Sequence, residues 1–157
     1  MVSSKSVLLI SNAHDQFALT ASLLRNDGYA VQFENTIDRC LEVARSQAPS
    51  LIISELAVPN IDGLELCCRL RRDRELRPIP LLLVGDLSRR SSIVSDGLRC
   101  GAAGYLQKPL DQFAVFDLCC RVARAGKAAN VVSVAEHGST LGNVAHWKLD
   151  TDLIFEN

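Results

Sequence analysis

Five short apolar runs recur along the first two thirds of the sequence, each followed by a longer stretch of mixed polar and apolar residues. The runs lie at residues 7–10, 29–33, 51–53, 81–84 and 105–107. Short runs rich in Val, Ile and Leu are typical of buried strands. In the stretches between them, apolar residues recur three and four positions apart, as Phe17, Ala21 and Leu24 do. That spacing predicts helices.

The polar residues beside these stretches predict where the helices begin and end. Asn12 or Asp15 is expected to cap the first helix, Thr36 the second and Asp111 the last. Gly28 suits the left-handed position that ends a helix. Two more helices are expected, over about 62–72 and about 93–101.

Strand and helix alternate five times, which predicts the fold class. Such alternation implies right-handed crossovers and a parallel sheet covered on both faces. We therefore expect an α/β fold, a doubly wound five-stranded sheet of flavodoxin-like order 2-1-3-4-5, over residues 1–126. Residues 127–157 are too few for a core of their own, and Val131–Val134 resembles a strand. They are expected to form a short β-rich extension.

Composition narrows the function classes. The formal net charge of -1 favours neither nucleic acid nor an anionic membrane. The first apolar run is too short for a signal peptide, so we expect a cytoplasmic protein with its six cysteines reduced. Cys68 and Cys120 are expected to be the most exposed, which leaves thiol sensing as an alternative. His14 has no second ligand near it in sequence, and no metal or cofactor is predicted.

Candidate chemistry gathers where the predicted strands end. In an open parallel sheet, ligands bind at the carboxyl ends of the strands. A single carboxylate, Glu55, follows the third apolar run. Glu55 is therefore expected where a reactive group would lie.

Several short motifs carry a family likeness through their order and spacing. They are Val7-Leu8-Leu9-Ile10, Gly28-Tyr29, Leu51-Ile52-Ile53, Pro59 with Asp62-Gly63, Ile79-Pro80, Gly101-Ala102 and Tyr105-Leu106-Gln107-Lys108-Pro109. With them, residues 6–125 resemble the receiver domain of bacterial response regulators over its whole length. The resemblance implies phosphoryl transfer to an aspartate, with an acidic pair holding Mg²⁺, a Ser or Thr hydroxyl and a lysine around it.

The sequence departs from this pattern at most of the implied positions. The acidic pair falls on Ser11 and Asn12, the acceptor on Glu55 and the hydroxyl on Gly85. The lysine is kept as Lys108, and the aromatic switch residue of the fifth strand is kept as Tyr105. Mg²⁺ requires hard oxygen ligands, and one carboxylate remains. We therefore predict a degenerate, phosphorylation-independent receiver that is not an enzyme.

Glu55 itself has two interpretations. Its carboxylate could imitate a phosphoryl group beside Lys108, or form an ion pair that only stabilises the fold. The absence of a hydroxyl at Gly85 favours the ion pair, because that hydroxyl is the usual readout in the family.

The last predicted helix suggests an interface. Phe113, Phe116 and Cys120 form an apolar arc beside the arc that faces the sheet. The family resemblance implies a partner or homodimer face made by the fourth helix, fifth strand and fifth helix, about residues 92–124. We expect a protein partner or a second copy there, and neither a membrane nor direct nucleic-acid binding.

Two alternatives stay open. The chain could be the regulatory half of an OmpR-type transcription factor whose DNA-binding domain is absent here, or a receiver that still autophosphorylates. The tail could begin a winged helix, pack on Phe113 and Phe116, or swap into a partner chain.

Overall fold

The computed structural model describes residues 5–85 and 101–125, and these form a doubly wound sheet. All neighbouring strands are parallel, in the order β2-β1-β3-β6-β7. The strands are β1 Ser6–Ile10, β2 Ala30–Glu34, β3 Leu51–Glu55, β6 Leu81–Gly85 and β7 Gly104–Gln107. Numbered by these five strands alone, the order is 2-1-3-4-5. The predicted fold class and strand order are confirmed.

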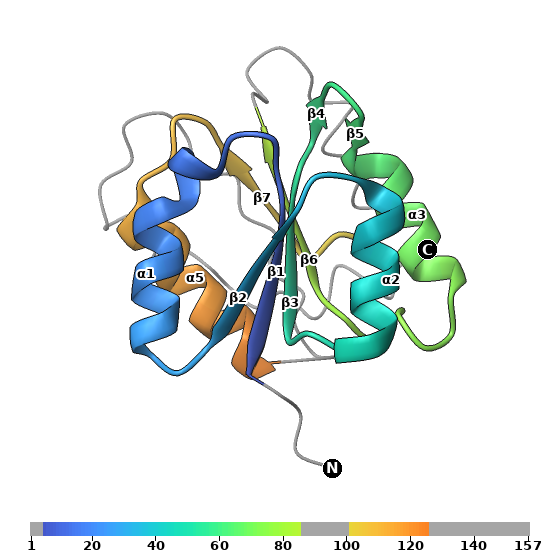
Figure 1. Ribbon diagram of the computed structural model, residues 1–157, viewed down its shortest axis with the longest axis horizontal. Coiled ribbons are helices and arrows are strands. Elements are labelled where there is room, and N and C mark those ends of the chain that lie inside the picture. Colours follow the sequence, from blue (N-terminus) through green and yellow to red (C-terminus); the bar gives the residue numbers. More distant parts are fainter. Residues whose placement is uncertain (1–4, 86–100, 126–157) are drawn as a thin grey trace, which may run out of the picture.

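Helices cover both faces of the sheet (Figure 1). On one face lie α1 (Ala18–Asn26) and α5 (Gln112–Ala125), and on the other α2 (Ile37–Gln47) and α3 (Gly63–Arg72). Alternate strand residues feed two separate cores. Leu8 packs with α2 and α3 in one core, and Leu9 with α1 and α5 in the other.

Local sequence sets most helix ends as predicted. Thr36 Oγ1 accepts a hydrogen bond from the Arg39 amide at 3.2 Å at the start of α2. Asp111 Oδ1 accepts one from the Phe113 amide at 3.1 Å at the start of α5. Gly28, just beyond α1, has a φ of 92°, the left-handed conformation that glycine adopts readily.

The start of α1 differs from the prediction. A 3₁₀ turn at His14–Phe17 precedes the helix, and neither Asn12 nor Asp15 caps it. The cap comes from α5 instead: Gln112 Oε1 accepts hydrogen bonds from the amides of Leu19 at 2.8 Å and Thr20 at 3.1 Å. Local sequence cannot predict this cap, because Gln112 lies 92 positions from Thr20 in the sequence.

The segment after β3 forms a small antiparallel hairpin. Its strands are β4 (Ala57–Val58) and β5 (Ile61–Asp62), with Asn60 between them at φ 67°. Gly63 then begins α3, and a Cβ there would lie 2.7 Å from the Glu55 carbonyl oxygen. Only glycine lets the chain turn this close to the end of β3.

Some predicted features lie outside the described residues. They are the helix over about 93–101 and the extension 127–157, so the domain boundary stays a prediction. No helix in residues 5–85 or 101–125 combines the length and apolar character that a membrane span requires.

Candidate functional site

Glu55 ends β3 with its side chain only 2% exposed. Its Oε2 lies 2.7 Å from Nζ of Lys108, which follows β7 and is 32% exposed. The Lys108 amide also donates a hydrogen bond to the Gly85 carbonyl oxygen at 3.0 Å. The ends of three adjacent strands therefore place an ion pair at the carboxyl edge of the sheet, where the family resemblance implied that Glu55 and Lys108 would meet.

The second carboxylate oxygen is also engaged. Glu55 Oε1 accepts hydrogen bonds from Ser11 Oγ at 3.2 Å and from Gln16 Nε2. Gln16 lies in the 3₁₀ turn before α1, and its amide nitrogen is also 3.2 Å from Ser11 Oγ. Both oxygens of this buried carboxylate thus have donors, as burial of a charge requires.

Gln16 was missed by the sequence reasoning. Its only sequence signal is that it follows the first strand closely on the same edge of the sheet. Which residue of that turn faces Glu55 is decided by the 3₁₀ geometry, and the sequence analysis predicted an ordinary capped helix there.

Asn12 does not join this network. Its Nδ2 donates a hydrogen bond to the Pro59 carbonyl oxygen at 2.8 Å, which ties the end of β1 to the β4–β5 hairpin. The family resemblance implies acids at positions 11 and 12. Here Ser11 donates a hydrogen bond to Glu55, and Asn12 donates one to the β4–β5 hairpin.

The space beside Gly85 is filled by Leu56, a residue that sequence reasoning did not single out. A Cβ on Gly85 would lie 2.9 Å from Leu56 Cβ and 3.2 Å from Leu56 Cδ2. Leu56 is 5% exposed and belongs to the core beneath α2 and α3. At the position where the family resemblance implies a hydroxyl, Gly85 has no side chain, and the apolar side chain of Leu56 occupies the adjacent space.

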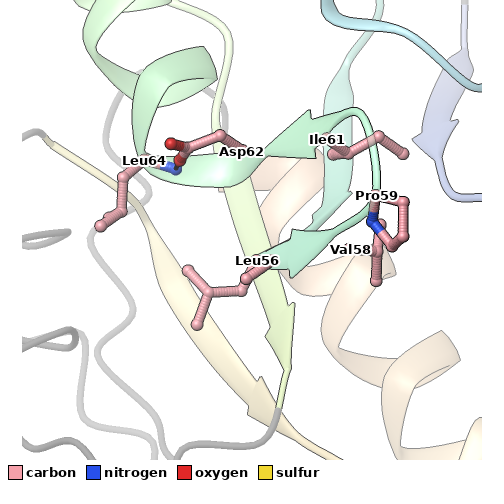
Figure 2. Close-up of a pocket in the computed structure, with 7 residues that line it drawn as sticks. Leu56, Val58, Pro59, Ile61, Asp62 and Leu64 are labelled. Atoms are coloured by element: carbon pink, nitrogen blue, oxygen red, sulfur yellow. Dashed lines mark hydrogen bonds between the residues drawn. The ribbon is translucent and has the colours of Figure 1, made fainter.

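An open pocket of about 590 Å³ adjoins Leu56 at the hairpin (Figure 2). Leu56 and Leu64 project to one side of it in this view, whereas Val58 and Pro59 lie toward the bend of the hairpin. Its one carboxylate, Asp62, caps α3 by accepting hydrogen bonds from the amides of residues 64 and 65 at 3.0 and 3.1 Å. The lining is otherwise apolar and offers no reactive group.

The donor set does not fit the divalent cation that the resemblance implies. Mg²⁺ is held by carboxylates and other hard oxygens in near-octahedral geometry. Here Glu55 is committed to Lys108, Ser11 and Gln16. Within the described ranges, no three His, Cys, Asp or Glu side chains gather where they could hold a metal. His14 is stacked against Phe33, with ring centroids 4.4 Å apart.

The predicted switch and interface residues differ in exposure. Tyr105 is fully buried in the core beneath α2 and α3, whereas Phe113 is 58% exposed. Phe116 is half-buried against the core beneath α1 and α5. Nothing in the fold tests a partner at these residues, so the interface stays a prediction.

The expectation that Cys120 is exposed is wrong. It is 5% exposed, and its Sγ lies 3.6 Å from Oδ2 of Asp27 at the end of α1. Burial, with the nearby Asp27 carboxylate, raises the pKa of the Cys120 thiol. The second apolar arc of α5 turns partly toward α1, which explains its width without a partner at this position.

The fold and the site together define a class. A doubly wound sheet with a carboxylate–lysine pair across its carboxyl edge is the arrangement of receiver domains. The profile of the response regulator receiver domain matches residues 7–120, and the chain belongs to this family. It is a response regulator receiver domain of two-component signalling, and such domains interact with protein partners and dimerise.

Relatives support this assignment. The response regulator MprA of Mycobacterium leprae is 34% identical over 112 residues, covering 69% of this chain and 46% of the relative. The DNA-binding dual master transcriptional regulator RpaA of Synechocystis is 30% identical over 136 residues, covering 86% and 55%. The signal receiver domain of a histidine kinase from Syntrophus aciditrophicus superposes with a TM-score of 0.69 at 25% identity, covering 88% and 98%. The chain spans about half the length of these two curated relatives.

Proposed function

We propose that this receiver acts without phosphorylation, by presenting one surface to a protein partner or a second copy. The observation that carries the proposal is the state of Glu55. Its carboxylate is buried, paired with Lys108 at 2.7 Å, and also bonded to Ser11 and Gln16. The groups that would receive and neutralise a phosphoryl group are already satisfied by one another.

Phosphoryl transfer depends on positioning and on neutralising charge. A phosphoryl group adds about -1.5 to -2 of charge. At this edge Lys108 already pairs with Glu55, and Gly85 offers no hydroxyl to bond the new oxygens. With no change of charge at the site, the usual charge-driven population shift has no trigger. The bound partner then meets one constant form of the domain.

Incubation with acetyl phosphate and Mg²⁺, followed by intact-mass analysis, tests the first half of the proposal. We expect no phosphate adduct, while a receiver that retains the acidic pair acquires one under the same conditions. An adduct on the wild-type chain that disappears in Glu55→Gln would establish the autophosphorylating alternative and end this proposal.

The Glu55→Gln variant also separates the two interpretations of Glu55. We favour the structural ion pair, for which the variant lowers the free energy of unfolding by about 1–2 kcal/mol. This is below the cost of breaking a fully buried pair, because Lys108 is a third exposed. Partner binding and dimerisation should not change. Glu75→Gln, an exposed glutamate, is the matched control and should alter neither property.

A shift in self-association of Glu55→Gln, measured by sedimentation at several concentrations, would instead favour the phosphoryl mimic. That outcome leaves phosphorylation independence intact but makes the Glu55 charge part of the signal.

One observation favours a second candidate, the regulatory half of an OmpR-type transcription factor. The similarity to RpaA extends over 136 residues, beyond the receiver itself, and that relative is named a transcriptional regulator. Sequencing the gene past the codon for Asn157 tests this candidate. A winged helix in frame supports it, and a stop codon there removes it.

A further inference from the structure

Two exposed apolar side chains lie near the start of α1 and the start of α5, two helices that pack against each other. In the part of the chain that the structure describes, the exposed large hydrophobic residues are Leu19 at 39% and Phe113 at 58%. Leu19 and Phe113 lie near each other, because the Leu19 amide donates a hydrogen bond to the side chain of Gln112, the residue before Phe113. Half-buried Leu23 and Phe116 continue the apolar surface along the two helices. We call these four residues the α1–α5 strip.

We propose that residues Val131–Val134 of the same chain lie along the α1–α5 strip and cover Leu19 and Phe113. Distance supports this occupant. The 14 residues of α5 span roughly 20 Å. A chain that turns after Ala125 and runs back extended covers that length in roughly six residues. Residues 126–130, Gly-Lys-Ala-Ala-Asn, supply the turn and roughly half of the return, so the valines that follow come level with Phe116 and Phe113.

The size of the exposed surface argues against a second copy as the occupant. Leu19 and Phe113 together expose roughly 200 Å², given the size of such side chains. A stable interface between separate proteins needs about 800 Å² from each partner. A tethered segment has no such requirement, because its effective concentration is about millimolar. Three β-branched apolar residues on a short tether match a small apolar strip.

The proposal specifies which side chains point inward. In an extended segment, alternate side chains face opposite sides. Val132 and Val134 therefore share the face toward the strip, and Ser133 faces solvent. This register gives a matched pair of variants, because Val132→Asp and Ser133→Asp add the same charge one residue apart.

The test uses the full chain with the photo-cross-linking residue p-benzoylphenylalanine at position 113, followed by peptide mapping. We expect an intrachain cross-link to the peptide that contains residues 131–134, with a yield independent of protein concentration. The control carries the cross-linker at Arg121, an exposed position on the outer face of α5, and should not give that product. Val132→Asp should reduce the position-113 cross-link at least about tenfold, and Ser133→Asp should leave it unchanged.

Three results would overturn the proposal. They are cross-linked dimers that increase with concentration, a position-113 probe that never reaches residues 131–134, and an equal effect of the two Asp variants. None of these results depends on phosphorylation, so this inference stands or fails separately from the proposed function.

Discussion

The packing of Leu56 against Gly85 makes a prediction that a series of variants can test. A methyl group added by Gly85→Ala would lie 2.9 Å from Leu56 Cβ, 3.2 Å from Cδ2 and 3.6 Å from Cγ. Gly85 ends a strand, and its φ is not in the positive range that excludes other residues. Any cost of Gly85→Ala therefore comes from contact with Leu56 and not from the backbone.

The expected magnitudes follow from these three distances. In the wild-type background, inserting a methyl group into a filled space should cost about 1–3 kcal/mol. Leu56→Ala removes Cγ and Cδ2 but keeps the closest atom, Cβ, so the cost of Gly85→Ala should fall only in part. Leu56→Gly removes all three contacts. Gly85→Ala should then stabilise the protein by about 0.4–1 kcal/mol, because alanine restricts the unfolded chain more than glycine does.

Equilibrium unfolding in urea, monitored by far-ultraviolet circular dichroism, measures each step of the series. The quantity to compare is the effect of Gly85→Ala in the three backgrounds, at constant m-value. Coupling between contacting residues of about 0.5–3 kcal/mol is expected. If Gly85→Ala costs the same in all three backgrounds, Leu56 does not occupy the space beside residue 85 and the reasoning is wrong.

Three more outcomes are expected. Gln112→Ala should cost about 1–2 kcal/mol and speed hydrogen exchange in the first turn of α1, because two helix amides lose their acceptor. The hydrogen bond from Arg45 lowers the pKa of Asp73 in the folded protein. The ionised Asp73 carboxylate therefore stabilises the fold above its unfolded pKa of about 3.8, and this contribution is lost as the pH falls through the lower folded pKa. A carboxyl NMR titration should show that low midpoint, raised in Arg45→Ala. Burial raises the pKa of Cys40 to about 12, so iodoacetamide should label half-buried Cys68 before Cys40.

The five strands were predictable because they depend on local pattern, and the Glu55–Lys108 pair was predictable because the strand order brings both residues to one edge. Alternating apolar runs fix which segments form the sheet, and the sheet order brings the residues after β3 and β7 to one edge. Once that order is known, Glu55 and Lys108 must lie near each other, with a distance of 2.7 Å in the structure. The caps at Thr36 and Asp111 depend only on residues two to three positions away.

The residues that escaped prediction act across elements. Gln16 reaches Glu55, Leu56 fills the space beside Gly85 and Gln112 caps α1. In each case the sequence shows an ordinary polar or apolar residue, and its role depends on how a side chain of a neighbouring segment is oriented. The prediction that Cys120 is exposed was wrong for the same reason. Helical periodicity places Cys120 on the second apolar face of α5, but it does not show that α1 packs beside that face.

The replacements at the sheet edge form one balanced set. In the pattern that the family resemblance implies, two acids and an acceptor carboxylate oppose a divalent cation and a lysine, and the charges cancel. In this chain Glu55 opposes Lys108, with Ser11 and Gln16 as neutral donors, and the charges cancel again. Restoring a single acid, as in Ser11→Asp, would place an unpaired carboxylate beside Glu55 and remove one of its donors. Restoring the hydroxyl at Gly85 would force it against Leu56. Either single substitution is therefore expected to destabilise the present arrangement before it provides a cation site, which supports the proposal that this receiver acts without phosphorylation.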